Sequence, residues 1–529
     1  MNVLISVYNK ENLNILIDHL IQKNAKIYST GGTYKFIESY LSNKNINNEC
    51  LINISEYTNF SEICNGRVKT LHPKIFGGIL ALKDNDNHMN DLKSIDGILF
   101  DLIVVNLYPF EDTIKSTQNH DEIIEQIDIG GHSLLRASIK NYKNVSTLCS
   151  PEYYTDYINN NISNLELAKI TISEIMKYDI IINNWFQNID GLNCNSIGQV
   201  YNFDREMKYG LNPYMKPSFL VKKNGTNRPF EILNGNPGYI NLLDASNGIR
   251  LVLEIKKILN VNCCASYKHT SPAGVSISLQ NHNDLKLTKN IDDFTNGEIV
   301  FLNTRNIDPK SSFGDFISYN GIVDINMAKE IKKYVSDGII AYGYENDALQ
   351  LLKTKKKGNY IVLKQTELID GIEFRDINGT TLVQPSNNMY IYPDELLSKG
   401  IVSDIQIIYD MILGFITLKY TQSNCICFVY KGNVIGIGAG QQNRVDCIKL
   451  AGEKSRQWFD RNNISSIDSE IVLVSDAFMP FSDNVEVAHE YNVKYILQPG
   501  GSIRDDEVLE CCNKYNIKMI LSDKRVFTH

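Results

Sequence analysis

Two short segments carry cations beside groups that can move protons. In G-R-V-K-T-L-H-P, Arg67 and Lys69 lie two residues apart between Gly66 and Pro73, which suits a polyanionic or enolate-like ligand. Lys268 and His269 follow an apolar run and precede the turn T-S-P-A-G. A histidine accepts a proton near neutral pH, and a lysine stabilises an oxyanion, so this pair suits acyl transfer. Taken singly, each segment also fits a solvated surface loop.

Glycine-rich turns at expected helix starts offer sites for an anion. S-T-G-G-T, from Ser29 to Thr33, lies between a strand-like run and a helical stretch, where a phosphate would fit. The alternative is a plain tight turn with Thr33 as the N-cap. D-I-G-G begins a second helical stretch at Asp128, and Lys140 follows about two turns into it. Asp128 is either a site residue or only a helix cap.

One aromatic residue is placed to enter a site. Tyr108 lies in N-L-Y-P-F, directly after the apolar run Leu102–Val105. Ligand sites in open α/β sheets lie at the carboxyl ends of strands, so Tyr108 is a candidate. An aromatic residue packed at a strand end is the competing interpretation.

The elements that must position these residues alternate along the first 150 residues. Short β-rich runs alternate with helical stretches, which predicts a parallel sheet flanked by helices. The expected strands are Val3–Val7, Lys26–Ser29, Leu102–Val105 and Val145–Leu148, and the expected helices are Lys10–Gln22, Thr33–Tyr40 and Asn164–Phe186. The segment Gln187–Phe203 is rich in Asn, Gly and Ser, so we predict a domain boundary near residue 200.

The remaining residues resume a mixed α/β pattern without a fixed-period repeat. This half is long enough that we expect more than a simple single sheet. The expected strands are Cys263–Tyr267, Gly338–Ala341, Tyr360–Lys364, Cys425–Tyr430, Glu470–Val474, Tyr495–Leu497 and Met519–Leu521.

Composition excludes several classes of protein. A formal charge of −8 without a long basic run argues against a nucleic-acid partner. Eleven cysteines occur without a C-x-x-C pair, so we expect reduced, structural thiols. No apolar run reaches about 18 residues and no leader pattern is present, so we expect a cytosolic protein with no membrane partner.

Four blocks of the first half together resemble the IMP cyclohydrolase domain: S-T-G-G-T, G-R-V-K-T-L-H-P, N-L-Y-P-F and D-I-G-G-x-S-L-L-R-A-x-x-K-N. The resemblance implies a methylglyoxal-synthase-like parallel-sheet domain over residues 1–200. It implies a catalytic set of Lys69, Tyr108, Asp128 and Lys140. It implies substrate contacts from Lys10, Thr30, Gly31, Gly32, Thr33, Arg67, Val68, Thr70, Asn106, Ile129 and Gly130.

Motifs of the second half resemble AICAR transformylase, namely S-Y-K-H-T-S-P-A-G, S-S-F-G-D-F, V-S-D-G-I-I-A, K-Y-T-Q-S-N, G-I-G-A-G-Q-Q-x-R and S-D-A-F-x-P-F-x-D-N. The resemblance implies an α/β domain over residues 201–529 built from two cytidine-deaminase-like subdomains. Lys268, His269 and Asn424 would be catalytic. Substrate contacts would come from Lys208, Tyr209, Phe313, Gly314, Asp337 and Arg444, and folate contacts from Val445, Phe478, Arg504, Asp505 and Arg525.

The resemblance implies a bifunctional enzyme of purine (IMP) biosynthesis, both a formyltransferase and a cyclohydrolase. It would formylate AICAR with 10-formyltetrahydrofolate as cosubstrate, then close the ring of FAICAR to give IMP, without a metal. It also implies a homodimer. A zinc deaminase is a rival, but H-x-E with P-C-x-x-C does not occur. A non-catalytic nucleotide sensor is a second rival.

The chain departs from the family pattern at two places. The family's S-V-S-D-K is here Ser6-Val7-Tyr8-Asn9-Lys10, which retains only the lysine of the last three residues. The family's R-Y-G-x-N-P-H begins here with Lys208, which keeps the charge but loses the bidentate fork for phosphate. The segment Leu450–Ser475 is also shorter than in longer members. Loss of one of the two activities is therefore the second hypothesis.

Overall fold

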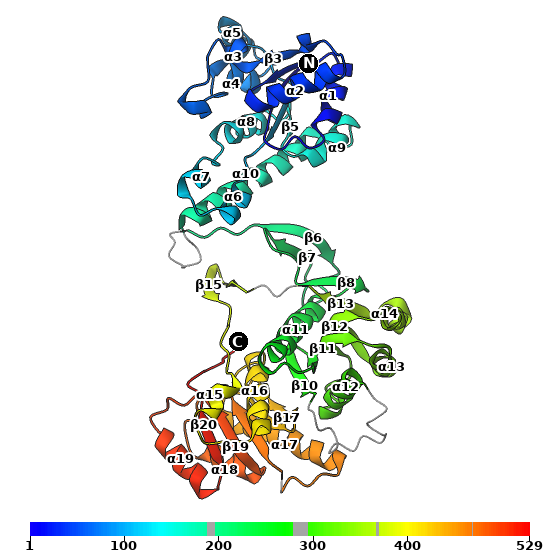
Figure 1. Ribbon diagram of the computed structural model, residues 1–529, viewed down its shortest axis with the longest axis vertical. Helices are drawn as coiled ribbons and strands as arrows, with labels where there is room; N and C mark the ends of the chain where they lie inside the picture. Colours follow the sequence, from blue (N-terminus) through cyan, green and yellow to red (C-terminus); the bar gives the residue numbers. More distant parts are fainter. Residues whose placement is uncertain (188–195, 279–294, 367–369, 468) are drawn as a thin grey trace. The chain divides into compact units, whose positions relative to one another are not determined.

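The computed structural model describes residues 1–187, 196–278, 295–366, 370–467 and 469–529. These residues form two compact units, Met1–Val200 and Tyr201–His529 (Figure 1). Of the Asn- and Gly-rich segment Gln187–Phe203, residues 188–195 lie outside the described ranges.

The first unit is built on a parallel sheet, as its alternating pattern predicts. Among the described residues five strands pair in the order β3-β2-β1-β4-β5, and every pairing is parallel. The strands are β1 (Asn2–Val7), β2 (Lys26–Ser29), β3 (Leu51–Asn53), β4 (Leu102–Asn106) and β5 (Ser146–Leu148). Because β1 and β4 are apolar on both faces, they form the centre of the unit, with core clusters on either side.

Helices flank this sheet on both faces. They are α1 (Leu13–Gln22), α2 (Gly31–Asn43), α3 (Ile54–Thr58), α4 (Pro73–Leu80), α5 (Asp86–Ser94), α6 (Phe110–Ser116), α7 (His120–Ile124), α8 (Ile129–Lys140), α9 (Tyr154–Ile158) and α10 (Asn164–Gln187). Short 3₁₀ turns span Asn48–Cys50, Cys64–Gly66 and Pro151–Tyr153. The first helix begins at Leu13 and not at Lys10, which leaves Tyr8–Lys10 as a turn at the end of β1.

The second unit is more than a simple single sheet, as its length led us to expect, although one large sheet dominates it. Within the described residues, eleven strands form one continuous sheet in the order β20-β19-β18-β16-β17-β10-β9-β11-β12-β13-β8. Their bounds are β8 (Phe230–Asn234), β9 (Cys263–Lys268), β10 (Ser271–Ile277), β11 (Asp315–Val323), β12 (Ser336–Tyr344), β13 (Ile361–Gln365), β16 (Ile426–Tyr430), β17 (Asn433–Gly438), β18 (Ile471–Ser475), β19 (Val493–Gln498) and β20 (Lys518–Leu521). Two separate hairpins pair β6 (Tyr201–Met207) with β7 (Ser218–Lys223), and β14 (Ile372–Ile377) with β15 (Thr380–Pro385).

This sheet consists of two halves with the same topology. The order β10-β9-β11-β12-β13 repeats as β17-β16-β18-β19-β20, with two antiparallel pairings followed by two parallel ones in each half. The halves meet where β10 pairs antiparallel with β17, at Ser276 and Asn433. The duplication is therefore topological, and it left no fixed period in the sequence.

Equivalent helices complete the two halves (Figure 1). A helix precedes the first hairpin of each half, α11 (Tyr239–Leu259) or α16 (Ile405–Lys419), and these two helices share one core on one face of the sheet. The opposite face carries two separate cores, one per half. Their helices are α12 (Asn296–Ile307), α13 (Ile325–Lys333) and α14 (Asn346–Lys353), and then α17 (Arg444–Asn462), α18 (Asp483–Glu490) and α19 (Asp505–Lys514). The short helix α15 (Pro393–Leu397) and the 3₁₀ turn Lys355–Gly358 lie between these elements in sequence.

The described residues carry neither a membrane-spanning helix nor a clustered metal-ligand set. They contain no helix that is long and apolar enough to cross a membrane. The same ranges hold no group of three or more His, Cys, Asp or Glu side chains arranged to bind a metal ion.

Candidate active sites

The carboxyl ends of β1, β2 and β4 open into one cavity of about 560 Å³ in the first unit. Parallel strands end at the same edge of a sheet, so the segments that follow them meet there. The predicted residues that line the cavity are Lys10, Thr30, Gly31, Gly32, Thr33, Arg67, Lys69, Thr70, Asn106, Tyr108, Asp128, Ile129 and Gly130. Val68 does not line it, because its backbone pairs with Ile63 to close the loop that carries Arg67 and Lys69.

The turn from β2 into α2 presents a helix N-terminus to this cavity. The N-cap is Thr30, so the interpretation of Thr33 as the cap is wrong. Thr33 is buried, and its hydroxyl donates to Val7 O (3.0 Å) and accepts from Val7 N (3.2 Å), which ties α2 to β1. Gly31 has φ +46°, and Lys69 Nζ lies 3.6 Å from where a Cβ would stand. The turn therefore brings backbone, helix dipole and ammonium group together, which favours an anion.

Carboxylates that the sequence did not single out hold both cations of the G-R-V-K-T segment. Lys69 Nζ lies 3.5 Å from Glu62 Oε2, and Arg67 pairs with Glu125. All four side chains are partly or fully solvent-accessible, so these pairs are weak enough to yield to a ligand. No motif contains Glu62 or Glu125, and they reach the cations only through the fold.

Tyr108 and Asp128 bring a phenol and a carboxyl group to this cavity. Burial raises the pKa of the Tyr108 phenol, and the negative charges of Asp128 and Glu62 raise it further. Asp128 caps α8 by accepting from Gly131 N (2.7 Å), and burial raises the pKa of its carboxyl. Asp128 is thus both a helix cap and a cavity residue. A neutral phenol can donate a hydrogen bond here while the neighbouring carboxylate accepts a proton.

Lys140 is the one predicted catalytic residue of this unit that lies elsewhere. It ends α8, whereas Asp128 precedes its first residue, and twelve residues along a helix span roughly 18 Å. The side chain of Lys140 faces a different surface hollow beside Phe76 and Leu165. One chain therefore cannot bring Lys140 and Asp128 to the same reacting atoms.

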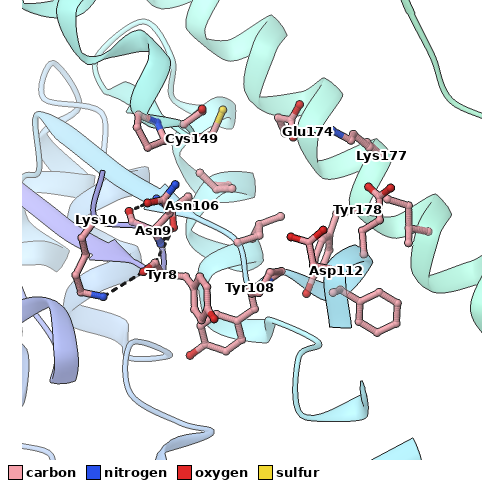
Figure 2. Close-up of a pocket in the computed structure, with 18 residues that line it drawn as sticks. Tyr8, Asn9, Lys10, Asn106, Tyr108, Asp112, Cys149, Glu174, Lys177 and Tyr178 are labelled. Atoms are coloured by element: carbon pink, nitrogen blue, oxygen red, sulfur yellow. Dashed lines mark hydrogen bonds and ion pairs between the residues drawn. The ribbon is translucent and has the colours of Figure 1, made fainter. Parts of the chain in front are cut away.

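A second cavity of about 560 Å³ adjoins the first (Figure 2). Lys10, Asn106, Tyr108 and Tyr8 line both cavities, and α10 contributes Glu174, Lys177 and Tyr178 to the second. The rings of Tyr8 and Tyr108 lie edge to face with centroids 5.9 Å apart.

In the second unit, Lys268 ends β9 and His269 begins a turn that a buried carboxylate fixes. Lys268 Nζ donates to Phe313 O. His269 and Thr270 both have positive φ, and Thr270 N donates to Asp244 Oδ1 (2.7 Å). Burial raises the pKa of Asp244 to about 6, although the Thr270 N–H opposes the shift. Asp244 lies in α11, and no motif pointed to it.

Three predicted nucleotide-contacting residues of this unit, Phe313, Gly314 and Asp337, lie at the starts of β11 and β12. Gly314 has φ +76°, and its N–H donates to Val335 O (3.0 Å), so the exposed Phe313 stands beside Lys268. Asp337 follows Ser336 and pairs with Lys356 Nζ at 2.6 Å. Behind them, Lys355 Nζ donates to the carbonyls of Ile331 (2.6 Å) and Tyr334 (2.5 Å).

Asn424 and Arg444 belong to the second half of the sheet. Asn424 Nδ2 donates to Gln441 O (3.1 Å), and the two backbones exchange hydrogen bonds. Arg444 donates to Asp476 Oδ1 (3.1 Å), while Asp476 Oδ2 accepts from Cys425 N (3.1 Å). Asp476 is fully buried, so Arg444 is the partner that balances its charge.

The register of the sheet puts the two groups of residues on one edge. Lys268 is level with Ser271 on β10, and the β10–β17 and β17–β16 pairings bring Ile426 to the same edge. Three strand spacings separate Lys268 from the start of β16, which is roughly 14 Å. A bound molecule of nucleotide size would have to span that distance to touch both Lys268 and Asn424.

The remaining predicted contacts are held by local interactions. Lys208 Nζ lies over the Tyr209 ring at 5.7 Å. Val445 is in the first turn of α17, and Phe478 is 38% exposed. Asp505 Oδ2 accepts from Gly501 N (2.7 Å), and the guanidinium groups of Arg504 and Arg525 lie over the rings of Phe481 (4.9 Å) and Phe527 (4.7 Å).

Comparison with known proteins gives two family matches. Residues 138–454 match the family described as AICARFT/IMPCHase bienzyme, and residues 13–133 match the MGS-like domain. A bifunctional purine biosynthesis protein PurH of Clostridium acetobutylicum is 36% identical, and one of Prochlorococcus marinus (strain MIT 9312) is 34% identical, each over 99% of both chains. A solved structure titled crystal structure of ForH is 23% identical over 35% of this chain and 98% of its own, with a TM-score of 0.30.

Proposed function

The chain belongs to the AICARFT/IMPCHase bienzyme family, and we propose that its two units divide the two reactions between them. It is a bifunctional enzyme of purine biosynthesis, a formyltransferase that formylates AICAR and a cyclohydrolase that converts the product to IMP. In the proposal, residues 1–200 close the ring and residues 201–529 transfer the formyl group. The formyl donor is 10-formyltetrahydrofolate.

The ring-closing assignment is supported above all by the cavity that Lys69, Tyr108 and Asp128 share. The carboxamide nitrogen of FAICAR attacks the formyl carbon, and the formyl oxygen gains negative charge. Lys69 and the Tyr108 phenol stabilise that oxygen, while Asp128 accepts the proton from the nitrogen. The oxygen then leaves as water with two protons, one returned by Asp128 and one lost by the formamide nitrogen, and the second ring of IMP is closed. The N-terminus of α2 and Arg67 hold the phosphate of the ribotide.

Formyl transfer needs a base and an oxyanion partner at one place, and Lys268 with His269 supplies both. The 5-amine of AICAR attacks the formyl carbon of the folate, and His269 removes the proton from the amine. Lys268 stabilises the tetrahedral intermediate, and Asn424, farther along the same sheet edge, orients the formyl donor. The folate N10 then leaves and takes up a proton, which gives FAICAR and tetrahydrofolate. Burial of Asp244, which fixes the turn of His269, supports this assignment.

We also propose a homodimer in the cytosol. The separation of Lys140 from Asp128 along α8 supports a dimer, because Lys140 can reach a ring-closing site only if a second chain contributes it. Sedimentation would test this: a stable monomer that retains both activities would rule the dimer out.

The test of the two assignments supplies AICAR and 10-formyltetrahydrofolate and follows tetrahydrofolate and IMP separately. His269→Ala should abolish formyl transfer but still cyclise added FAICAR. Lys69→Ala should form FAICAR without IMP. His489→Ala and Lys93→Ala, exposed residues of the same types outside both sites, serve as matched controls.

Either assignment fails if its variant retains the wild-type rate of the reaction in question. Tetrahydrofolate without IMP from the unmodified protein would instead support the loss of one activity.

A further inference from the structure

The wall between the two cavities of the first unit is an aromatic pair, Tyr8 and Tyr108. The rings meet edge to face, with centroids 5.9 Å apart and planes at 64° (Figure 2). Both side chains line both cavities. Tyr8 is 54% exposed and Tyr108 is 38% exposed, so each ring is held on some sides only. Tyr8 also stands where the family motif has serine.

The backbone beneath Tyr8 is firmly held. Asn106 Oδ1 accepts from Tyr8 N (2.6 Å) and Asn9 N (2.9 Å), and Asn106 Nδ2 donates to Asn9 O (2.8 Å). Lys10 Nζ donates to Tyr8 O (3.1 Å). Asn106 is also the last residue of β4, two residues before Tyr108. The same side chain therefore fixes the base of one ring and lies next to the base of the other.

Tyr108 has space on both of its sides. The ring-closing cavity lies on one side, and the second cavity of about 560 Å³ lies on the other. A phenol that swings toward the second cavity moves away from Asp128 and Lys69, which line only the first cavity. An edge-to-face contact restrains such rotation, because the positive edge of one ring attracts the negative face of the other.

We propose that Tyr8 is a positioning residue for ring closure, which holds the Tyr108 phenol on the side of Lys69 and Asp128. The inference rests on the proposed function, in which Tyr108 stabilises the formyl oxygen. Tyr8 acts through its ring and not through its hydroxyl.

The test measures ring closure with FAICAR as substrate in Tyr8→Ala, Tyr8→Phe, Tyr108→Phe and the double variant Tyr8→Ala/Tyr108→Phe. Tyr8→Ala should lower kcat by roughly 3- to 10-fold with little change in KM, because a misplaced group affects the transition state more than binding. Tyr8→Phe keeps the edge-to-face contact and should have the kcat of the unmodified protein. In the Tyr108→Phe background, Tyr8→Ala should cause little further loss, since its effect passes through the phenol.

Formyl transfer and the melting temperature report whether Tyr8→Ala remains folded, and both should match the unmodified protein. The inference is overturned if Tyr8→Ala keeps the wild-type kcat, if it raises only KM, or if its effect is equally large in the Tyr108→Phe background. A Tyr108→Phe variant with full activity would overturn the role proposed for Tyr108 itself. Failure of the role of Tyr108 is thus distinguishable from failure of the Tyr8 inference, because the Tyr108→Phe variant alone reports it.

Discussion

A methyl group added at Gly438 should impair formyl transfer without touching ring closure. Gly438 ends β17 beneath α17, and a Cβ built there would stand 2.2 Å from Cys447 O. The obstacle is backbone, so no rotamer change relieves it. To restore an ordinary contact of about 3.4 Å, α17 must retreat by roughly 1 Å. That helix begins with Arg444, whose guanidinium balances Asp476.

The magnitude follows from this displacement. Overpacking a well-packed core costs about 1–3 kcal/mol of unfolding free energy, so the melting temperature of the second unit should fall. A displacement of about 1 Å at a site can lower the rate by roughly 100-fold. Gly438→Ala should therefore lower the kcat of formyl transfer by about 10- to 100-fold. Ring closure, in a separate unit, should keep its rate.

The assay follows tetrahydrofolate release and, separately, the conversion of added FAICAR to IMP. Gly343→Ala is the matched control, because a Cβ at Gly343 on β12 meets Ile322 at an ordinary 3.5 Å. A Gly438→Ala protein with the melting temperature and formyl-transfer rate of the unmodified chain would refute the reasoning that α17 must move.

Three further predictions concern buried charges. Arg444→Met leaves Asp476 unpaired in the core and should lower the unfolding free energy measured in urea by about 3–5 kcal/mol, whereas Arg444→Lys should lower it less. Identical urea unfolding curves for both variants and the unmodified protein would count against the prediction. Burial raises the pKa of Asp244 from 3.8 to about 6, so the folded state holds a proton that the unfolded state loses, and stability falls as pH rises from 4 to 6. The melting temperature of Asp244→Asn should therefore rise relative to that of the unmodified chain over this range, and a constant difference between the two would contradict the prediction. Burial lowers the pKa of Lys355 from 10.5 to about 8, so between these pH values the unfolded state binds more protons than the folded state, and stability rises with pH. The unfolding free energy of the unmodified protein relative to that of Lys355→Met should rise from pH 8 to 10.5, and a constant value would contradict the prediction.

Most motif residues of the first unit meet in the fold because each block lies in one short segment at a strand end or helix start. Thr30–Thr33, Lys69 and Tyr108 meet in one cavity since parallel strands end at one edge. The supporting carboxylates could not be predicted in this way. Asp244 is 26 residues from Thr270, and no local pattern links them. Asp476 does lie in the motif S-D-A-F-x-P-F-x-D-N, but only the folded chain brings it to Arg444.

The fold was predictable where strands are apolar runs between turns and less so where pairing is long-range. The parallel sheet of the first unit follows from its alternating pattern, but β3 is only three residues long and carries too weak a signal. The single sheet of the second unit depends on one pairing between Ser276 and Asn433, which are 157 residues apart. Short-range patterns contain no information about such a pairing.

That pairing should also determine the order in which backbone amides become protected from hydrogen exchange during refolding. Within each half, strands and helices contact neighbours that are close in sequence, so each half can close its loops at low entropic cost. The β10–β17 contact, where Ser276 Oγ lies 2.8 Å from Asn433 Oδ1, must wait until both halves exist. The backbone amides along this contact should therefore be the last to become protected from hydrogen exchange during refolding. Residues at the sheet edge it aligns, Lys268 and Asn424, acquire their relative placement only at that final step.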